Sequence, residues 1–274
     1  MKTYSFSSLF FIALILFAFT SCRNSDNEIE NNTPGNLQIK FENGFLHLGN
    51  IVLNQTTQTS TNGQKHKFST LKYIVSNITL IDENGNEVKY HYNDPDRGAF
   101  IIDQAQAIAG VSYLNLSAIP KGRYKKIKFG LGISPQAYLL GLDGQGEFWD
   151  KAKTAGMAWS WAAGYIFTKI EGQYGSSTAE TEFRNHAGNM GNPAAKGTPD
   201  LYREITLELP TTARVSQSVT PSIHILADFN HFLSGAIPLT LDETNASAMG
   251  SSPHLVRVTD NLSQMFIVDH VHND

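Results

Sequence analysis

The residues best suited to chemistry lie in segment 156–172, which holds two of the three tryptophans. Trp159 and Trp161 are two positions apart, and Met157 is close to both. Indoles can be oxidised and can stack, and side chains two apart on a strand project from the same face. The spacing therefore predicts a strand, or the rim of one, that presents both indoles on one side. Indoles that fill the core of a sandwich would show the same spacing, so the pattern alone leaves both interpretations open.

Histidine is the second residue type with chemical promise, and the chain has nine. Neutral imidazole is a good copper ligand, and a methionine thioether adds a softer donor suited to Cu(I). His186 lies beside glycine, His224 lies on an expected strand, and His254 follows a proline in a polar stretch. His270 and His272 share a face if the chain is extended there. For each histidine alone, a surface or hydrogen-bonded imidazole is the more common role.

The first 36 residues predict an export signal followed by a tether. Residues 1–21 have a lysine near the start, an apolar run too short to cross a bilayer, and small residues at the end. Cys22 is the only cysteine, and we expect it to be the lipidated first residue of the mature protein. Ordinary cleavage nearby, with a free thiol, is the alternative. Residues 22–36 are polar and acidic, which is typical of a flexible tether.

The export signal and the charge narrow the location and the partners. We expect an extracytoplasmic protein held to the membrane by its lipid, on the periplasmic face or the cell surface of an outer membrane. The formal net charge is −4, and removal of residues 1–21, which hold one lysine and no acid, makes it −5. This charge argues against nucleic acid as a partner. The chain contains no serine elbow, no zinc-protease motif and no phosphate loop, so we do not expect an enzyme.

Residues 37–274 read as short strands separated by turns. Alternating or β-branched stretches are followed by polar turns such as residues 82–86, and clean helical periodicity is rare. The pattern predicts an all-β fold, a single-domain antiparallel two-sheet β-sandwich with Tyr73, Ile78 and Leu80 in its core. The clearest expected strands are 37–41, 70–81, 119–132, 203–209, 222–229 and 262–268.

Blocks of residues that run from 71–80, through the tryptophan segment at 156–167, to 265–266 follow one another in an order that resembles the MbnP-like family of extracytoplasmic, copper-associated β-sandwich proteins. The most specific block is GMAWSWAAGYIF at residues 156–167. The resemblance implies that a tryptophan of this block is oxidised to kynurenine by a dihaem peroxidase-like partner and then helps to bind Cu(I). By that resemblance Trp159 is the first candidate for modification and Trp161 the second. The other matching blocks are 71–80, 119–124, 129–133, 171–172, 183–188 and 265–266.

The sequence also departs from the copper-binding pattern that the resemblance implies. Copper-binding members carry one histidine where this chain has Ser76, a second near the position of Leu139, and cysteine pairs that are absent here. A copper site in this chain therefore has to use other residues. The resemblance favours His186 with Met157 or a further histidine near the tryptophans, and His224 and His254 are the remaining candidates.

Two functions follow from these observations. The first is a lipid-anchored MbnP-like binding protein in copper or other metal handling, with an oxidisable tryptophan. The alternative is a surface lipoprotein that binds a glycan or a protein partner on Trp149, Trp159, Trp161 and Tyr165. Imidazoles and a methionine around the indoles would favour metal, whereas a flat aromatic patch edged by Asp, Asn and Arg would favour sugar.

Overall fold

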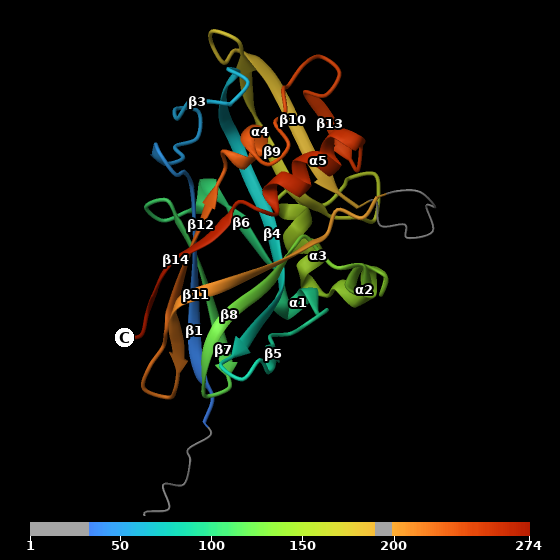
Figure 1. The fold of residues 1–274 in the computed structure, drawn as a ribbon. Coiled ribbons are helices and arrows are strands. Elements are labelled where there is room, and N and C mark those ends of the chain that lie inside the picture. Colours follow the sequence, from blue (N-terminus) through green and yellow to red (C-terminus); the bar gives the residue numbers. More distant parts are fainter. Residues whose placement is uncertain (1–32, 190–198) are drawn as a thin grey trace, which may run out of the picture. The chain divides into compact units, whose positions relative to one another are not determined.

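The computed structural model describes residues 33–189 and 199–274, which form two β-sheets connected by loops and short helices (Figure 1). The expected signal (1–21), the lipidation site Cys22 and most of the expected tether lie outside the described residues. The first strand begins at Gly35, so residues 35 and 36, the last two of the expected tether, belong to a strand. None of the helices in the described part of the chain has the length and apolar composition needed to cross a bilayer.

The smaller sheet has five strands in the order β14-β12-β1-β2, and β7 also pairs with β1. The β1–β12 pair is parallel, and the other pairs of this sheet are antiparallel. Its strands are β1 (Gly35–Phe45), β2 (Gly49–Asn50), β7 (Val111–Ile119), β12 (Ser222–Asp228) and β14 (Phe266–His272).

The larger sheet has nine strands in the order β11-β8-β4-β9-β10-β13, and β3, β5 and β6 pair with its long strand β4. Only the β10–β13 pair of this sheet is parallel among the described residues. Its strands are β3 (Gln58–Thr59), β4 (Lys65–Asp82), β5 (Glu87–Lys89), β6 (Phe100–Asp103), β8 (Gly122–Leu131), β9 (Ile166–Gly175), β10 (Thr181–Gly188), β11 (Arg203–Val215) and β13 (Ser247–Gly250).

Short helices connect these strands. The two longest in the described chain are α3 (Glu147–Thr154) and α5 (Pro253–Leu262). The part of residues 262–268 before Phe266 was expected to be strand, but it is the end of α5 and a turn. A serine N-cap, a proline in the first turn and buried Leu255, Val258 and Leu262 favour helix there. The other helices are α1 (Pro95–Gly98), α2 (Pro135–Tyr138), α4 (His231–Ser234) and the 3-10 turns η1 (Gln104–Gln106) and η2 (Leu142–Gln145).

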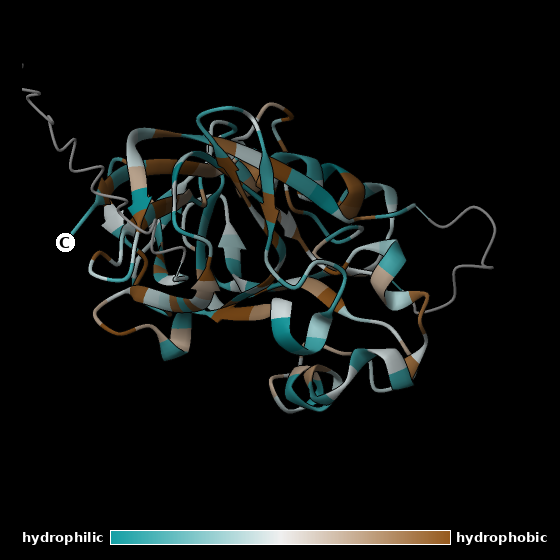
Figure 2. Ribbon diagram, turned by 90° about the horizontal axis from the view of Figure 1, so that it is seen from below, coloured by the Kyte–Doolittle hydropathy of each residue, from teal (hydrophilic) through white to brown (hydrophobic). Residues whose placement is uncertain are grey.

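The two sheets share one aromatic core, so the predicted two-sheet β-sandwich is confirmed. Phe41 of the smaller sheet makes edge contacts with Tyr73 and Phe129 of the larger, at ring-centroid distances of 6.2 and 5.7 Å. Tyr73, Ile78 and Leu80 are at most 1% exposed, as predicted. Apolar and polar residues alternate along the strands (Figure 2). The two parallel pairs are the difference from the purely antiparallel expectation, because a period of two does not reveal strand direction.

A bulge in β4 explains how core residues of different parity share one face. Tyr73 and Ile78 are five positions apart, yet both point inward, because the pairing register of β4 with β8 shifts between Ser76 and Thr79. Asn77 takes the left-handed conformation there, with φ of 54°. Its side chain donates to Asn93 Oδ1 at 3.1 Å and so stabilises the bulge.

Candidate functional site

Trp159 and Trp161 lie on a loop between α3 and β9, so of the two expectations, a strand or the rim of one, the strand is wrong. Gly156, with φ of 69°, ends the helix in the left-handed region, and Met157 N then donates to Ala152 O at 2.7 Å. The loop closes on itself because Trp159 N donates to Gly164 O at 3.0 Å. Strand β9 therefore begins only at Ile166. We call residues 157–165 the tryptophan loop.

The two indoles have different environments but touch each other. Trp159 is 5% exposed, and its Nε1 donates to Asn189 O at 2.6 Å, which satisfies the buried indole N–H. Trp161, in contrast, is 60% exposed at the tip of the loop. Their ring centroids are 5.4 Å apart with an interplanar angle of 41°. The exposed ring is thus in contact with the buried one, although the two do not share a strand face.

A depression of about 540 Å³ opens beside the tryptophan loop. Among the described residues that line it, Lys153 is the one charged side chain, and there is no imidazole, thioether or carboxylate. The depression therefore offers aromatic faces rather than metal ligands. Its described lining consists of Leu142, Trp149, Lys153, Ala158, Trp159, Ser160, Trp161, Ala162 and Ala163.

The aromatic environment continues inward from the depression. Trp149 meets Tyr165 edge to face at a centroid distance of 5.1 Å. Tyr165 is buried, its hydroxyl donates to Gln145 Oε1 at 3.2 Å, and burial raises its pKa. Met157 is fully buried in the same cluster as Trp159. The structure thus brings Met157 and the tryptophans together, but the thioether belongs to the core.

His186 lies on β10, where it contacts a carboxylate on the neighbouring strand. Its Nε2 is 2.7 Å from Glu171 Oε1, and the hydroxyl of Thr70 donates to Glu171 Oε2 at 2.9 Å. Burial lowers the pKa of His186, and the nearby Lys169 adds to this effect, against the opposing pull of Glu171. Burial alone would raise the pKa of Glu171, but the hydrogen bonds from Thr70 and His186 hold it below its ordinary value. The expected pair at neutral pH is a neutral imidazole and an ionised carboxylate.

A lysine separates this pair from the tryptophan loop. Lys169 Nζ lies 3.4 Å from Gly156 O and 4.0 Å from Glu171 Oε1. The ammonium group is held by the carbonyl at the start of the loop on one side and by the carboxylate on the other. Because it carries a positive charge beside His186, it opposes the binding of a second cation there.

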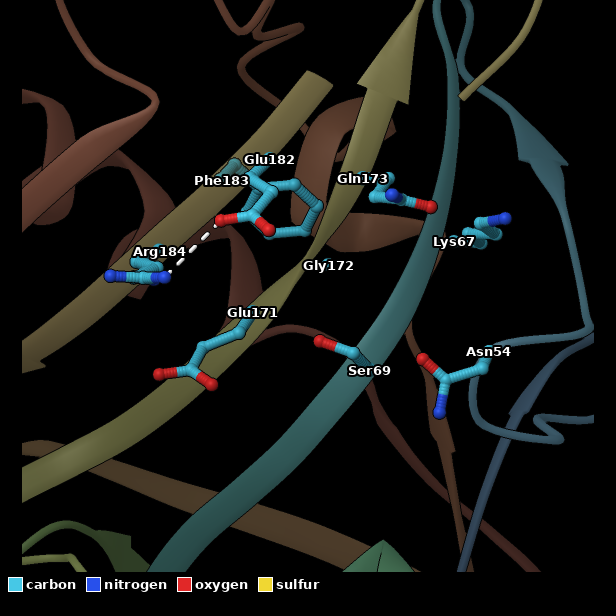
Figure 3. Close-up of a pocket in the computed structure, with 9 residues that line it drawn as sticks. All are labelled: Asn54, Lys67, Ser69, Glu171, Gly172, Gln173, Glu182, Phe183 and Arg184. Carbon is cyan, nitrogen blue, oxygen red and sulfur yellow. Dashed lines mark hydrogen bonds and ion pairs between the residues drawn. The ribbon is translucent and has the colours of Figure 1, made fainter. Parts of the chain in front are cut away.

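A polar pocket of about 240 Å³ lies next to Glu171 on the same face of the larger sheet (Figure 3). Arg184 and Glu182 form an ion pair at 3.2 Å along its edge. Gly172 lies in its floor, where a Cβ would come within 2.0 Å of Lys67 O, so the close approach of β4 requires glycine. The remaining described lining consists of Asn54, Ser69, Gln173 and Phe183.

The other histidine candidates lie elsewhere. His254 Nε2 is 2.7 Å from Asn185 Oδ1, and because Asn185 and His186 are consecutive on β10 their side chains point to opposite faces of the sheet. Burial lowers the pKa of His254, and Arg257 adds to the shift. His224 lies on β12 of the smaller sheet. The structure therefore does not bring His186, His224 and His254 into one site.

The two positions where the resemblance implies histidines hold residues without a metal-binding side chain. Ser76 is buried, and its hydroxyl donates to Gly132 O at 2.6 Å, so the hydroxyl is already used. Leu139 is 53% exposed at the end of α2. The structure therefore offers no metal ligand at Ser76 or Leu139, the positions where the resemblance implies histidines.

Sequence reasoning missed two features of the functional surface. The roles of Lys169 and of the Asn189 carbonyl carry no signal in sequence, because both depend on where β9 and β10 lie relative to the loop. The second feature is a close group of His224, Asp269 and His270, whose ligand atoms lie within 4.8 Å of one another. The spacing of the histidines near the C-terminal strand was noticed, but their pairing with β12 was not predictable from it.

The described residues define a two-sheet β-sandwich with an aromatic loop against its larger sheet. The family model described as MbnP matches residues 34–250, and the chain therefore belongs to the MbnP family, as the sequence resemblance indicated. Among solved structures, MbnP from Methylosinus trichosporium matches with a TM-score of 0.51 and 15% identity, covering 87% of this chain and 98% of that chain. This similarity shows a shared fold. No curated protein sequence matches the chain.

Proposed function

We propose that the protein is a lipid-anchored extracytoplasmic member of the MbnP family that takes part in copper handling. In this proposal the anchor is Cys22, and a dihaem peroxidase-like partner oxidises a tryptophan of the loop to kynurenine. The protein acts as a binding protein and not as an enzyme. Family membership supports the link to copper, because the chain matches the MbnP family model over residues 34–250 and the sequence resemblance to that family implies an association with copper.

The observation that carries the proposal is the contact between an exposed and a buried indole. An oxidising partner needs an accessible aromatic group, and Trp161 is the indole that reaches the surface. Trp159, in ring contact at 5.4 Å, is held in one orientation by its hydrogen bond to Asn189 O. The pair therefore combines access for a partner with a fixed position for a modified side chain. Trp159 remains the first candidate for modification, and Trp161 the second.

The described residues do not assemble a Cu(I) ligand set at the loop before modification. The depression lacks imidazole and thioether among its described lining, and Lys169 lies between His186 and the loop. We therefore expect binding of Cu(I) to be weaker than in the copper-binding relatives, or absent from the unmodified protein. His186 with Met157 is the pair to test first, because Met157 begins the loop and His186 lies on β10, which pairs with the strand β9 that follows the loop.

Mass spectrometry of the protein purified from its native host tests the oxidation. The kynurenine mass change on a peptide that contains Trp159 or Trp161 is the expected result. Cu(I) titration of modified and unmodified protein, each with a His186→Ala variant, then tests the ligand. Unmodified tryptophans together with no uptake of Cu(I) would remove the proposal. The anchor is tested separately: Cys22→Ala should move the protein to the soluble fraction, and unchanged detergent partitioning would contradict the lipid anchor.

The composition of the depression also favours a second candidate function, the binding of a glycan. Trp149, Trp159 and Trp161 line it, and the described lining lacks imidazole and carboxylate. Sugar rings stack on such aromatic faces. Against this, the Asp, Asn and Arg edge that sugar hydroxyls prefer is missing from the described lining. Binding of a panel of bacterial and plant glycans that is lost in Trp161→Ala would establish this function, and the absence of any binding would remove it.

A further inference from the structure

The outer face of the smaller sheet carries a group of histidines and carboxylates that the proposed function does not use. We call Glu42, His224, Asp269, His270 and His272 the histidine face. They come from three adjacent strands, β1, β12 and β14. The group is remote from the tryptophan loop in the topology, because the loop packs against the larger sheet.

Strand pairing aligns the three imidazoles. In the β12–β14 register His224 is opposite His270, and Ser222 is opposite His272. Side chains two apart on a strand share a face, so His270 and His272 point the same way. The rings of His224 and His270 have centroids 4.8 Å apart, and those of His270 and His272 4.5 Å apart.

A bulge in β14 adds a carboxylate to this row. His224 pairs with His270 and Ile225 with Val268, so Asp269 has no residue opposite it. The core-facing positions confirm the extra residue, because Phe266 and Val268 pack inward and the next inward side chain is Val271. The bulge lets Asp269 and the following His270 approach the same neighbour.

The ligand atoms of the group are close enough for one metal ion to reach them after small side-chain rotations, although His270 and Asp269 are hydrogen-bonded to each other without it. His270 Nδ1 lies 2.6 Å from Asp269 Oδ2, and His224 Nδ1 lies 3.9 Å from the same oxygen. One ligand atom from each of His224, Asp269 and His270 lies within 4.8 Å of the others. A tetrahedral site with bonds of about 2.0 Å separates its ligand atoms by about 3.3 Å. Small rotations of the partly exposed side chains of His270 and Asp269 bridge the difference.

Glu42 fixes the innermost imidazole from the other side. Its Oε2 lies 2.9 Å from His224 Nε2, which is shielded from solvent and makes no hydrogen bond of good geometry to another described residue. A carboxylate against one ring nitrogen orients a histidine so that its other nitrogen can bind metal. In His224 that other nitrogen is Nδ1, which faces Asp269.

Charge favours a cation on this face. Glu42 and Asp269 supply two negative charges, and the positively charged neighbour on β1 is Lys40, which is in register with His224. The ammonium of Lys40 lies 6.0 Å from the centre of the Tyr113 ring, which holds it near that aromatic face. With neutral imidazoles, these groups together carry one net negative charge.

We propose that the histidine face binds a borderline divalent cation, Zn²⁺ or Cu²⁺, through His224 Nδ1, His270 and Asp269. His272 supplies a fourth donor, and Glu42 positions His224. Imidazole nitrogen with one carboxylate oxygen is a donor set for these ions, whereas Ca²⁺ prefers oxygen alone and Cu(I) prefers softer sulfur donors. By the usual order of stability Cu²⁺ binds more tightly than Zn²⁺.

The test is calorimetric titration of the untagged mature chain with ZnCl₂ and with CuSO₄. We expect one ion per chain, a loss of affinity of roughly tenfold to a hundredfold in Glu42→Gln, which removes the charge that positions His224, and a larger loss in His270→Ala and in Asp269→Asn, which remove ligands. His47→Ala is the matched control, because His47 is exposed and outside the group. His186→Ala should also leave the affinity unchanged, so that failure here is separable from failure of the copper function proposed for the tryptophan loop.

Electron paramagnetic resonance of the Cu²⁺-loaded wild type supplies a readout that does not depend on any variant. Coupling of the copper to at least two imidazole nitrogens is the expected signature. A spectrum without nitrogen coupling, no binding by the wild type, or wild-type affinity in His270→Ala would each overturn the proposal.

Discussion

The tryptophan loop and the histidine face differ in what they offer a ligand. The loop presents aromatic rings around a depression whose described lining includes one charge, whereas the face gathers imidazoles and carboxylates with ligand atoms within 4.8 Å. The first has groups that can be oxidised or stacked, and the second has groups that can bind a divalent ion. Family resemblance points to the loop, but the close group of imidazole and carboxylate atoms found among the described residues lies on the other sheet.

The difference arises from how each region is built. The loop connects α3 to β9 without strand pairing, so its side chains can have different depths within a few residues, as Trp159 and Trp161 do. The histidine face is built on paired strands, where register fixes which side chains meet, and a single bulge adds Asp269. Neighbouring side chains in the loop therefore differ in burial, whereas the side chains of the histidine face are aligned by strand pairing.

The largest expected effect tests how deeply the tryptophan loop is part of the core. Trp159→Ala should lower the free energy of unfolding by about 3 to 5 kcal/mol, because it removes a buried ring. Trp161→Ala is the control, and as a surface change it should cost within about 0.5 kcal/mol. Urea unfolding at neutral pH measures both. Equal costs would show that the two rings do not differ in burial.

The second prediction concerns the loss of folding stability in acid, which has to be known before metal binding is measured at different pH values. His66 is buried between Phe45, Phe68 and Phe232, and burial lowers its pKa from 6.5 to about 4, with only a small offset from the backbone of Gln64. Between pH 4 and 6.5, His66 therefore binds a proton in the unfolded chain but not in the folded chain. The stability that results is complete above pH 6.5 and is lost as the pH falls towards 4, by about 3 kcal/mol.

A leucine at this position provides the measurement. His66→Leu should remove that part of the decline between pH 7 and 4, as followed by urea unfolding at several pH values. The exposed His47→Leu is the control and should keep the wild-type decline. An unchanged slope in His66→Leu would mean that His66 is not the source of the acid sensitivity. Metal titrations at different pH values are best made with the His66→Leu variant, in which acid unfolding is less easily mistaken for release of the metal ion.

The sequence predicted the fold well, because strand patterns are local. The expected strand 70–81 lies within β4, and 203–209 lies within β11, which continues to Val215. The tryptophan loop was expected to be a strand or the rim of one, since side chains two positions apart, as in Trp159 and Trp161, project from one face of a strand. The hydrogen bond from Trp159 N to Gly164 O and the positive φ of Gly156 decide otherwise. Neither is visible in a period of two.

The candidate sites were less predictable, because they depend on contacts between strands that lie far apart in the sequence. His270 and His272 were noticed by spacing, but their meeting with His224 depends on the antiparallel pairing of β12 with β14 and on a bulge at Asp269. His186 was singled out by resemblance, and its neighbours Glu171 and Lys169 come from the adjoining strand. Residues that meet through strand pairing carry no joint signal in one sequence.

The third prediction compares the two regions by the stability that Zn²⁺ adds to variants of each. At a concentration of Zn²⁺ about a hundred times its dissociation constant, the wild type should gain about 2.7 kcal/mol in unfolding free energy, because the ion binds only the folded pair of strands. His270→Ala should gain far less, while Trp161→Ala should gain as much as the wild type. Thermal unfolding with and without Zn²⁺ measures this. A gain that depends on Trp161 instead would move the divalent site to the loop.

The smallest expected effect concerns the lysine beside each region. Lys40 is in register with His224 and repels an incoming divalent ion, so Lys40→Gln should tighten Zn²⁺ binding by roughly fivefold, equivalent to about 1 kcal/mol. Lys153→Gln removes the charge at the tryptophan depression, where Lys153 pairs with Asp150 at 2.8 Å, and should leave Zn²⁺ affinity unchanged. The gain in Lys40→Gln should shrink in high salt, because the charges lie at the surface. Titration of both variants at low and high NaCl measures this, and equal effects of the two substitutions would show that the ion senses only the net charge of the protein and not a site on the histidine face.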